Sequence, residues 1–287
     1  MSTLCANLLP ESTQIACFWK IFAVINLFFA VICCCEPVKQ KRRSLFVKNL
    51  PLLFQYCLYI MLCRGGTAML WYEIAFLVVY ACLTVALITM KALNMGNRKR
   101  GVVKTITAVS FAVAGLLGCI KTGGGNFVIA CIGLFFAAIG DVLLIFMDDR
   151  RWFVGGVLSF SMASLVLSVF SVVQYGFVWW SVIVFAVFAV ANVLCQKFNV
   201  YSFGKNVVYL NIYTVLVAVC GSLGLTLIFQ GTAQLPTFLF GMGCFMYYVS
   251  DIFLGLYLFK FRNRIVDAIN SLLYFPGMVL IAFSMIV

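Results

Sequence analysis

Histidine is absent from the 287 residues, and acidic side chains are scarce, with eight Asp and Glu against twenty Lys and Arg. Without histidine the chain has no imidazole for a metal site, a Ser-His-Asp triad or a proton shuttle. The 13 cysteines form no Cys-x-x-Cys pair and lie mostly within apolar runs. They indicate small buried side chains rather than a disulfide framework or a zinc site. We therefore expect no metal and no other cofactor.

Charged residues of either sign are also few, at 10% of the chain, while 65% of the residues are hydrophobic. A soluble domain has about a quarter charged and about half apolar residues. The chain has too little polar surface to cover a water-soluble globule of this length, so its composition predicts a membrane protein. In that setting the net charge of +12 is typical of basic membrane loops, and we expect no nucleic-acid partner.

Long apolar stretches follow one another with only short loops between them. The stretches are Cys17–Cys35, Leu45–Cys63, Ala68–Met90, Thr105–Ile120, Asn126–Met147, Trp152–Gln174, Phe177–Cys195, Val207–Ile228, Thr237–Leu258 and Ile265–Val287. A helix needs about 20 such residues to cross the hydrocarbon core. The sequence therefore predicts an all-α, polytopic bundle of transmembrane helices.

The basic residues are distributed unevenly between the two sides of such a bundle. With ten spans drawn, seventeen of the twenty Lys and Arg fall in loops on one side. Only Arg64 and Lys121 fall on the other side, and Lys20 lies within the first stretch. Because basic loops stay in the cytoplasm, this pattern predicts that both termini are non-cytoplasmic.

Asp141 and Asp251 each lie well inside an apolar stretch. An ionisable group at that depth costs about 2.5 kcal/mol or more, and it usually faces a bundle interior or an aqueous cavity. The two predicted helices run in the same direction and place both carboxyls about 10 Å from their inner ends. Two carboxyls at one depth can share a cavity, one as general acid and the other as ionised base. Two separate structural aspartates are the alternative.

Short motifs surround both aspartates. They are Gly140-Asp141-x-Leu143-Leu144, Gly156-x-x-x-Phe160, Ser250-Asp251-x-x-Leu254 and Tyr274-Phe275-x-Gly277. In this order they resemble the YhhN-like membrane proteins, the lysoplasmalogenase family, and Lys104 resembles a lysine of that family. The resemblance covers about Ala68 to Val287. It implies an eight-helix core at 68–287, with 1–63 as an added N-terminal hairpin of two transmembrane helices.

The resemblance also implies an activity, the hydrolysis of the vinyl ether bond of lysoplasmalogens to a fatty aldehyde and a glycerophospho-base. Asp141 and Asp251 would be the catalytic acid and base, and the partners would be a lysophospholipid substrate and membrane lipids. The residues that would contact the substrate are Lys104, Ser164, Tyr209, Ser250, Tyr274 and Met278.

Two further readings stay open. Ser164 and Met278 stand where the family usually has His and Gln, which favours an inactive homologue that binds lipid. A small proton-coupled transporter could use Asp141 and Asp251 as a relay.

Overall fold

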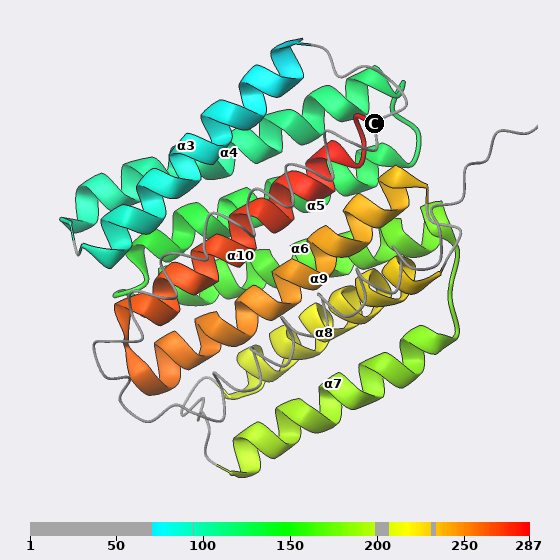
Figure 1. The fold of residues 1–287 in the computed structure, drawn as a ribbon. Coiled ribbons are helices and arrows are strands. Elements are labelled where there is room, and N and C mark those ends of the chain that lie inside the picture. The colour runs from blue at the N-terminus through cyan, green and yellow to red at the C-terminus, as the bar shows by residue number, and fades with distance from the viewer. Residues whose placement is uncertain (1–70, 94, 199–206, 231–233) are drawn as a thin grey trace, which may run out of the picture. The chain divides into compact units, whose positions relative to one another are not determined.

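The computed structural model describes residues 71–93, 95–198, 207–230 and 234–287 (Figure 1). In this part of the chain every regular element is a helix, and eight helices are long and apolar enough to cross a membrane. They are α3 (Trp71–Ala92), α4 (Asn97–Lys121), α5 (Phe127–Leu143), α6 (Arg150–Tyr175), α7 (Trp180–Lys197), α8 (Val207–Phe229), α9 (Leu235–Leu256) and α10 (Arg264–Phe283). The chain is a multi-pass integral membrane protein with an all-α fold. The predicted hairpin at 1–63 lies outside the described residues.

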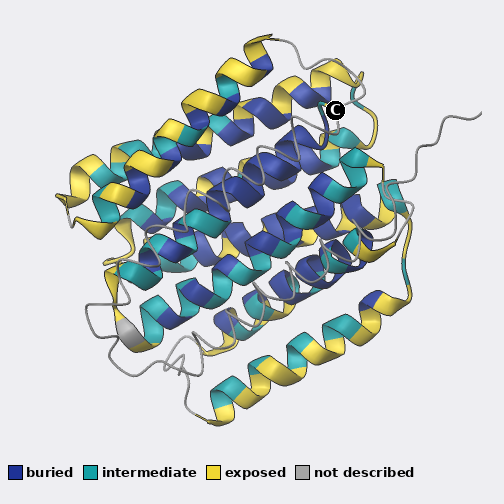
Figure 2. Ribbon diagram, in the orientation of Figure 1, coloured by how far each residue is buried: buried dark blue, intermediate teal, exposed yellow. Residues whose placement is uncertain are grey.

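Consecutive helices alternate in direction, so that α5 and α9 run parallel to each other (Figure 1). Helix α10 contacts α3, α4, α5 and α9, and Figure 2 shows its residues mostly buried. Helix α7 packs chiefly on α8, and of its residues only Ser181 is buried. The described bundle therefore has a tightly packed centre around α10 and a loosely attached helix, α7.

Several helices extend beyond the apolar stretches that the sequence predicts. Helix α4 begins at Asn97 rather than at Thr105, and so includes Lys104. Hydropathy detects only the apolar part of a helix, whereas long basic side chains can extend from its first turns toward the polar interface. Helices α6 and α10 begin at polar caps, because Asp149 and Asn263 accept hydrogen bonds from backbone N–H groups two residues ahead.

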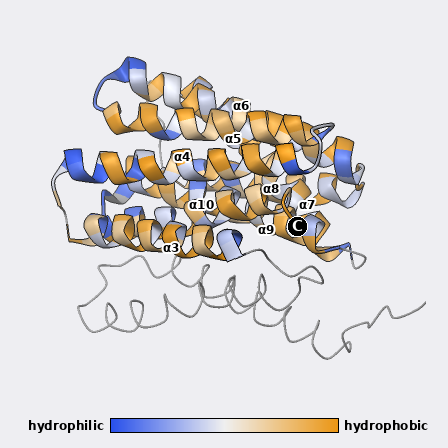
Figure 3. Cartoon of the chain, turned by 90° about the horizontal axis from the view of Figure 1, so that it is seen from above, coloured by the Kyte–Doolittle hydropathy of each residue, from blue (hydrophilic) through white to orange (hydrophobic). Residues whose placement is uncertain are grey.

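Hydrophilic residues are concentrated at the ends of the helices, and the middle parts of the helices are mostly hydrophobic (Figure 3). We call one of these ends the basic end, where α4, α6, α8 and α10 begin. It carries Arg98, Lys99, Arg100, Arg150, Arg151, Lys197, Lys260, Arg262 and Arg264. At this end α5 tightens into a 3-10 turn, η2 (Leu144–Phe146), and α9 widens into a π-helical turn, η4 (Tyr257–Phe261). The positive-inside rule predicts that the basic end faces the cytoplasm.

Glycine pairs allow α8, α9 and α10 to touch through their backbones. A Cβ on Gly243 of α9 would lie 2.6 Å from the carbonyl oxygen of Gly277 on α10. A Cβ on Gly224 of α8 would lie 2.7 Å from the carbonyl oxygen of Gly241 on α9. Small residues at such crossings are the usual means of close helix packing in lipid, where apolar side chains gain little by leaving the solvent.

The crossing of α9 and α10 can be tested with one methyl group. Gly243→Ala is expected to lower the melting temperature in detergent, because overpacking of this kind costs about 1–3 kcal/mol. Gly255→Ala is the control in the same helix, since its methyl group would meet no atom within 4 Å. Equal melting temperatures for the two variants would contradict the close contact.

Candidate active site

Asp141 is sealed inside the bundle near the end of α5, with only 3% of its surface exposed. Lys104 extends from the first turns of α4 and places its Nζ 3.0 Å from Asp141 Oδ1. The preceding residue, Gly140, lets α6 approach, because a Cβ there would lie 2.8 Å from the ring of Phe160. Asp141 Oδ2 makes no hydrogen bond within the described part of the chain. One carboxyl oxygen is therefore paired with Lys104, and the other makes no hydrogen bond in the described chain although the Tyr274 side chain lies near the carboxyl.

A second ion pair lies close to the first. Lys91 at the end of α3 binds Asp267 at the start of α10. Lys91 interacts electrostatically with both Lys104 and Asp141. Four helices thus contribute two positive and two negative side chains to a neutral, mostly buried cluster. Among the described residues, no three His, Cys, Asp or Glu side chains gather closely enough to hold a metal ion.

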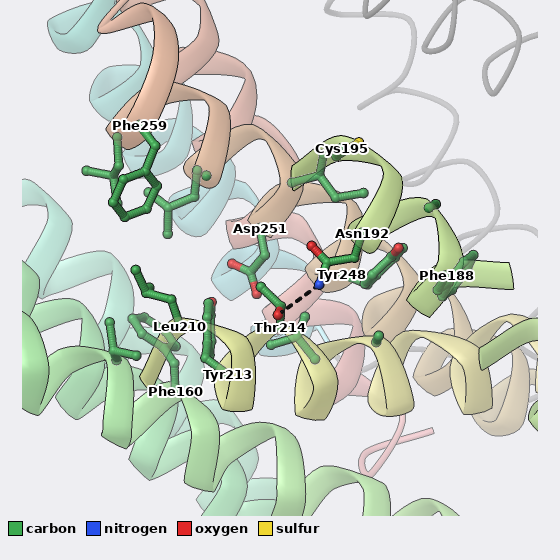
Figure 4. Close-up of a pocket in the computed structure, with 18 of the residues that line it drawn as sticks. Phe160, Phe188, Asn192, Cys195, Leu210, Tyr213, Thr214, Tyr248, Asp251 and Phe259 are labelled. Carbon is green, nitrogen blue, oxygen red and sulfur yellow. Dashed lines mark hydrogen bonds between the residues drawn. The ribbon is translucent and has the colours of Figure 1, made fainter. Parts of the chain in front are cut away.

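Asp251 lies on α9 in different surroundings. It lines a cavity of about 110 Å³ between α6, α7, α8 and α9 (Figure 4). The Tyr213 hydroxyl on α8 lies close enough to the Asp251 carboxyl to interact with it electrostatically. Neither Tyr213 Oη nor Asp251 Oδ2 makes a hydrogen bond within the described residues. No ion pair of the described chain includes Asp251, so the carboxyl faces the cavity without a neutralising cation.

The rest of the cavity lining is mostly apolar and aromatic. A polar contact crosses it from helix to helix, where Asn192 Nδ2 of α7 donates to Thr214 Oγ1 of α8 at 3.1 Å. Figure 4 shows this pair beside Asp251. Cys195, one turn further along α7, also lines the cavity and interacts electrostatically with Lys260. The lining also includes Leu258 and Phe259 of η4, so the cavity reaches the basic end.

Three aromatic rings, which we call the tyrosine wall, lie around the two aspartates. The centroid of Tyr274 lies 5.9 Å from that of Tyr247 and 5.9 Å from that of Phe160. Tyr274 interacts electrostatically with both Asp141 and Asp251, and the charge of Asp141 acts on Asp251. Asp141 is not among the residues that line the cavity. The structure therefore brings the aspartates into electrostatic range without placing both on one cavity surface.

Three of the residues that were predicted to contact the substrate lie beside Asp141 or at the tyrosine wall. Lys104 pairs with Asp141, and Tyr274 is part of the tyrosine wall. Ser164 of α6 lies 3.0 Å from the Tyr247 hydroxyl and also donates to the carbonyl oxygen of Phe160 at 2.9 Å. Ser164 therefore supports the wall.

The other three predicted residues are placed differently. Ser250 is buried and donates to the Tyr247 carbonyl oxygen at 2.6 Å, which uses its hydroxyl within α9. Met278 is fully buried in α10. Tyr209 is 43% exposed in the first turn of α8 and does not line the cavity. Its position at the basic end is that of an interface residue.

The site also contains residues that the sequence analysis did not select. Tyr247 could have been found, because it precedes Asp251 by one helical turn and therefore shares its face. Asn192 was also detectable as an amide within an apolar stretch. Tyr213 carried no such signal, since one tyrosine in an apolar helix is unremarkable until its neighbours are known.

These features define a class: a polytopic α-helical membrane protein with one ion-paired carboxyl and one carboxyl facing a cavity within the span. A model of the YhhN family matches residues 99–285, and the chain belongs to that family. The match includes both aspartates, so the resemblance predicted from their motifs is confirmed. Neither the curated proteins nor the solved structures include a match to the chain.

The ion pair between Lys104 and Asp141 predicts that removing one charge lowers the free energy of unfolding much more than removing both. Lys104→Met leaves a carboxylate buried without its cation and should lower the free energy of unfolding by about 3–5 kcal/mol. The double variant Lys104→Met/Asp141→Asn removes both charges and should recover most of that loss. Thermal unfolding in detergent measures both.

Lys99→Met is the control for this comparison, since Lys99 is exposed on the same helix. It should unfold like the original protein. A double variant no more stable than Lys104→Met would show that the pair is not what stabilises α4 against α5.

Proposed function

We propose that the protein is an intramembrane hydrolase that cleaves the vinyl ether bond of lysoplasmalogens, releasing a fatty aldehyde and a glycerophospho-base. One observation carries the proposal. Asp251, in the second aspartate motif of a YhhN-family chain, presents a carboxyl without a cation to a mostly apolar cavity within the membrane span. Membership of the family is consistent with this reaction.

The reaction needs a proton donor and a way to bring water to the substrate. A proton adds to the vinyl carbon remote from the ether oxygen and leaves an oxocarbenium ion. Water attacks the carbon attached to oxygen and gives up a proton, which forms a hemiacetal. The hemiacetal then breaks its other C–O bond to release the aldehyde and the glycerol hydroxyl. One water is consumed and no electrons are transferred, as in the hydrolysis of a glycoside by two carboxyls.

Asp251 is suited to the role of acid. A carboxylate in an apolar cavity is costly without a partner cation, so this carboxyl is the one that would hold a proton for transfer. Its cavity is where a hydrocarbon substrate would lie. The neighbouring Tyr213 hydroxyl could donate a hydrogen bond to the carboxylate that remains after the transfer.

Asp141 is suited to the opposite role. Its pairing with Lys104 favours the ionised form of the carboxyl. Its available Oδ2 and the Tyr274 hydroxyl, which has no hydrogen-bond partner in the described chain, are the groups that would orient the attacking water. The negative charge of Asp141 would also stabilise the oxocarbenium ion.

A lipid-binding protein without turnover is the second candidate. Ser164, at the place of the family's usual His, is already hydrogen-bonded to the tyrosine wall. Met278, at the place of the usual Gln, offers a thioether and no strong hydrogen-bonding group. If the missing His and Gln are required for the reaction, binding would remain and hydrolysis would be lost.

The proposal predicts aldehyde release from a choline or ethanolamine lysoplasmalogen by the purified full-length protein. Asp251→Asn should reduce the rate by about 10²–10⁴-fold, because it removes the acidic proton donor. Asp141→Asn should cause a loss of similar size. Asp148→Asn, an exposed acid in the loop after α5, should release aldehyde at the original rate.

Melting temperature in detergent separates loss of chemistry from loss of fold in each variant. Well-folded original protein that releases no aldehyde would contradict the hydrolase. Turnover that survives in a folded Asp251→Asn variant would remove Asp251 from the role of acid.

A further inference from the structure

A second hollow lies further from the basic end than the Asp251 cavity, along α7 and α8. It is an apolar groove of about 410 Å³, lined by α6, α7 and α8. Its lining includes Val169 and Val172 of α6, Phe185 of α7, and Val219 and Leu223 of α8. None of these residues lines the Asp251 cavity, so the groove adds surface that the proposed chemistry does not use.

The groove and the cavity follow one another along α7 and α8, and we call the two together the slot. On α7, one stripe at intervals of three and four residues consists of Ser181, Phe185, Phe188, Asn192 and Cys195. Such spacing places them on a single face of the helix. The first two line the groove, and the last three line the cavity.

The facing side of α8 shows the same continuity. Thr214 and Ala218 line the cavity, and Ser222 lines the groove one turn further on. Their spacing of four residues keeps them on one face. The slot therefore runs along both helices, from the basic end past Asp251 and toward the opposite end of the bundle.

The two parts of the slot differ in what they can bind. The polar side chains that line the groove are three serines, and each already donates to a backbone carbonyl oxygen. Ser168 donates to Ser164 at 2.7 Å, Ser181 to Val178 at 2.6 Å, and Ser222 to Val219 at 2.8 Å. The groove wall is thus apolar in effect, whereas the cavity presents the unpaired Asp251 Oδ2 and Tyr213 Oη.

We propose that the slot binds one hydrocarbon chain of a single-chain lipid in the groove, with the polar linkage beside Asp251 and the head group toward the basic end. The choice of bond beside Asp251 rests on the proposed function. The lining residues of α7 and of α8 each follow a single line along their helix, which suits one extended chain. Asn192 and Ser181 are separated by eleven residues, or about 16 Å of helix, which is about half of the hydrocarbon core.

The proposal also assigns residues that limit chain length. Val182 and Val219 line the groove away from Asp251, so larger side chains there would shorten the space for the tail. Helix α7 has only one buried residue, so this wall of the slot packs on the bundle less tightly than the other described helices do.

The test uses the full-length protein in lipid nanodiscs and a saturated alkyl-ether lysophosphocholine with a diazirine at the tip of its tail. On irradiation, labels are expected on the groove residues of α6, α7 and α8. Val182→Trp and Val219→Trp should each reduce labelling by a long-tailed probe several-fold and preserve labelling by a short-tailed one. Val187→Trp is the control, since Val187 is exposed on α7 and lines neither hollow; it should change neither.

Labels spread evenly over the lipid-facing residues, including Val187, would overturn the slot. Equal effects of Val219→Trp and Val187→Trp would overturn it as well. Because the probe lacks the vinyl double bond, its binding does not depend on hydrolysis. Groove labelling without aldehyde release would contradict only the proposed function, whereas aldehyde release with labelling elsewhere would contradict only the slot.

Discussion

The ion pair between Lys104 and Asp141 joins α4 to α5 inside the membrane span, and the arrangement of the site depends on it. A charge in hydrocarbon must be paired, hydrated or removed by a proton. Asp141 meets this requirement with a lysine, and the neighbouring pair of Lys91 and Asp267 keeps the whole cluster neutral. Asp251 has no such cation in the described chain, so water in its cavity or a proton would have to satisfy the requirement. The same constraint is met differently at the two aspartates, and the proposed acid and base roles rest on this difference.

Helix packing sets the distance between these two carboxyls. Gly243 and Gly277 bring α9 against α10, which places Tyr247 and Tyr274 in edge-to-face contact. Gly140 lets Phe160 approach α5 beside Asp141. The tyrosine wall is a consequence of these close approaches. It holds the aspartates near each other while only Asp251 lines the cavity, and the glycines therefore contribute to the site although they carry no functional group.

Sequence reasoning was most successful where a property is local along the chain. All eight predicted stretches from Ala68 onward correspond to spans of the structure, because hydropathy is a sum over neighbouring residues. The placement of Asp141 and Asp251 within two of these helices followed from the same pattern. The pairing of Lys104 with Asp141 did not, because Lys104 lay in the short charged region before a predicted stretch. Only the packing of α4 on α5 shows that the long side chain of Lys104 reaches inward to Asp141.

The cavity and its lining residues could not be predicted from the sequence, for a physical reason. In a soluble helix, a strong apolar face indicates which side is buried. Apolar residues surround a membrane helix on all sides, since lipid and protein interior are equally hydrophobic. No pattern along α7 distinguishes its slot-facing stripe from its outer face except Asn192. The neighbours of Asp251, above all Tyr213, depend on which helices are adjacent, and the spacing of residues along one helix does not contain that information.

The different surroundings of the aspartates bear directly on the proposed reaction. An acid that protonates a vinyl ether must lie against the hydrocarbon part of the substrate, and Asp251 is the carboxyl that lines the apolar cavity. A water-orienting base must remain ionised while it is shielded from the lipid tail, and the tyrosine wall and Lys104 provide that setting for Asp141. Exchanging the two environments would leave an ionised group beside the tail and a proton donor out of its reach. The proposed division of roles therefore follows from the position of each carboxyl as well as from its charge.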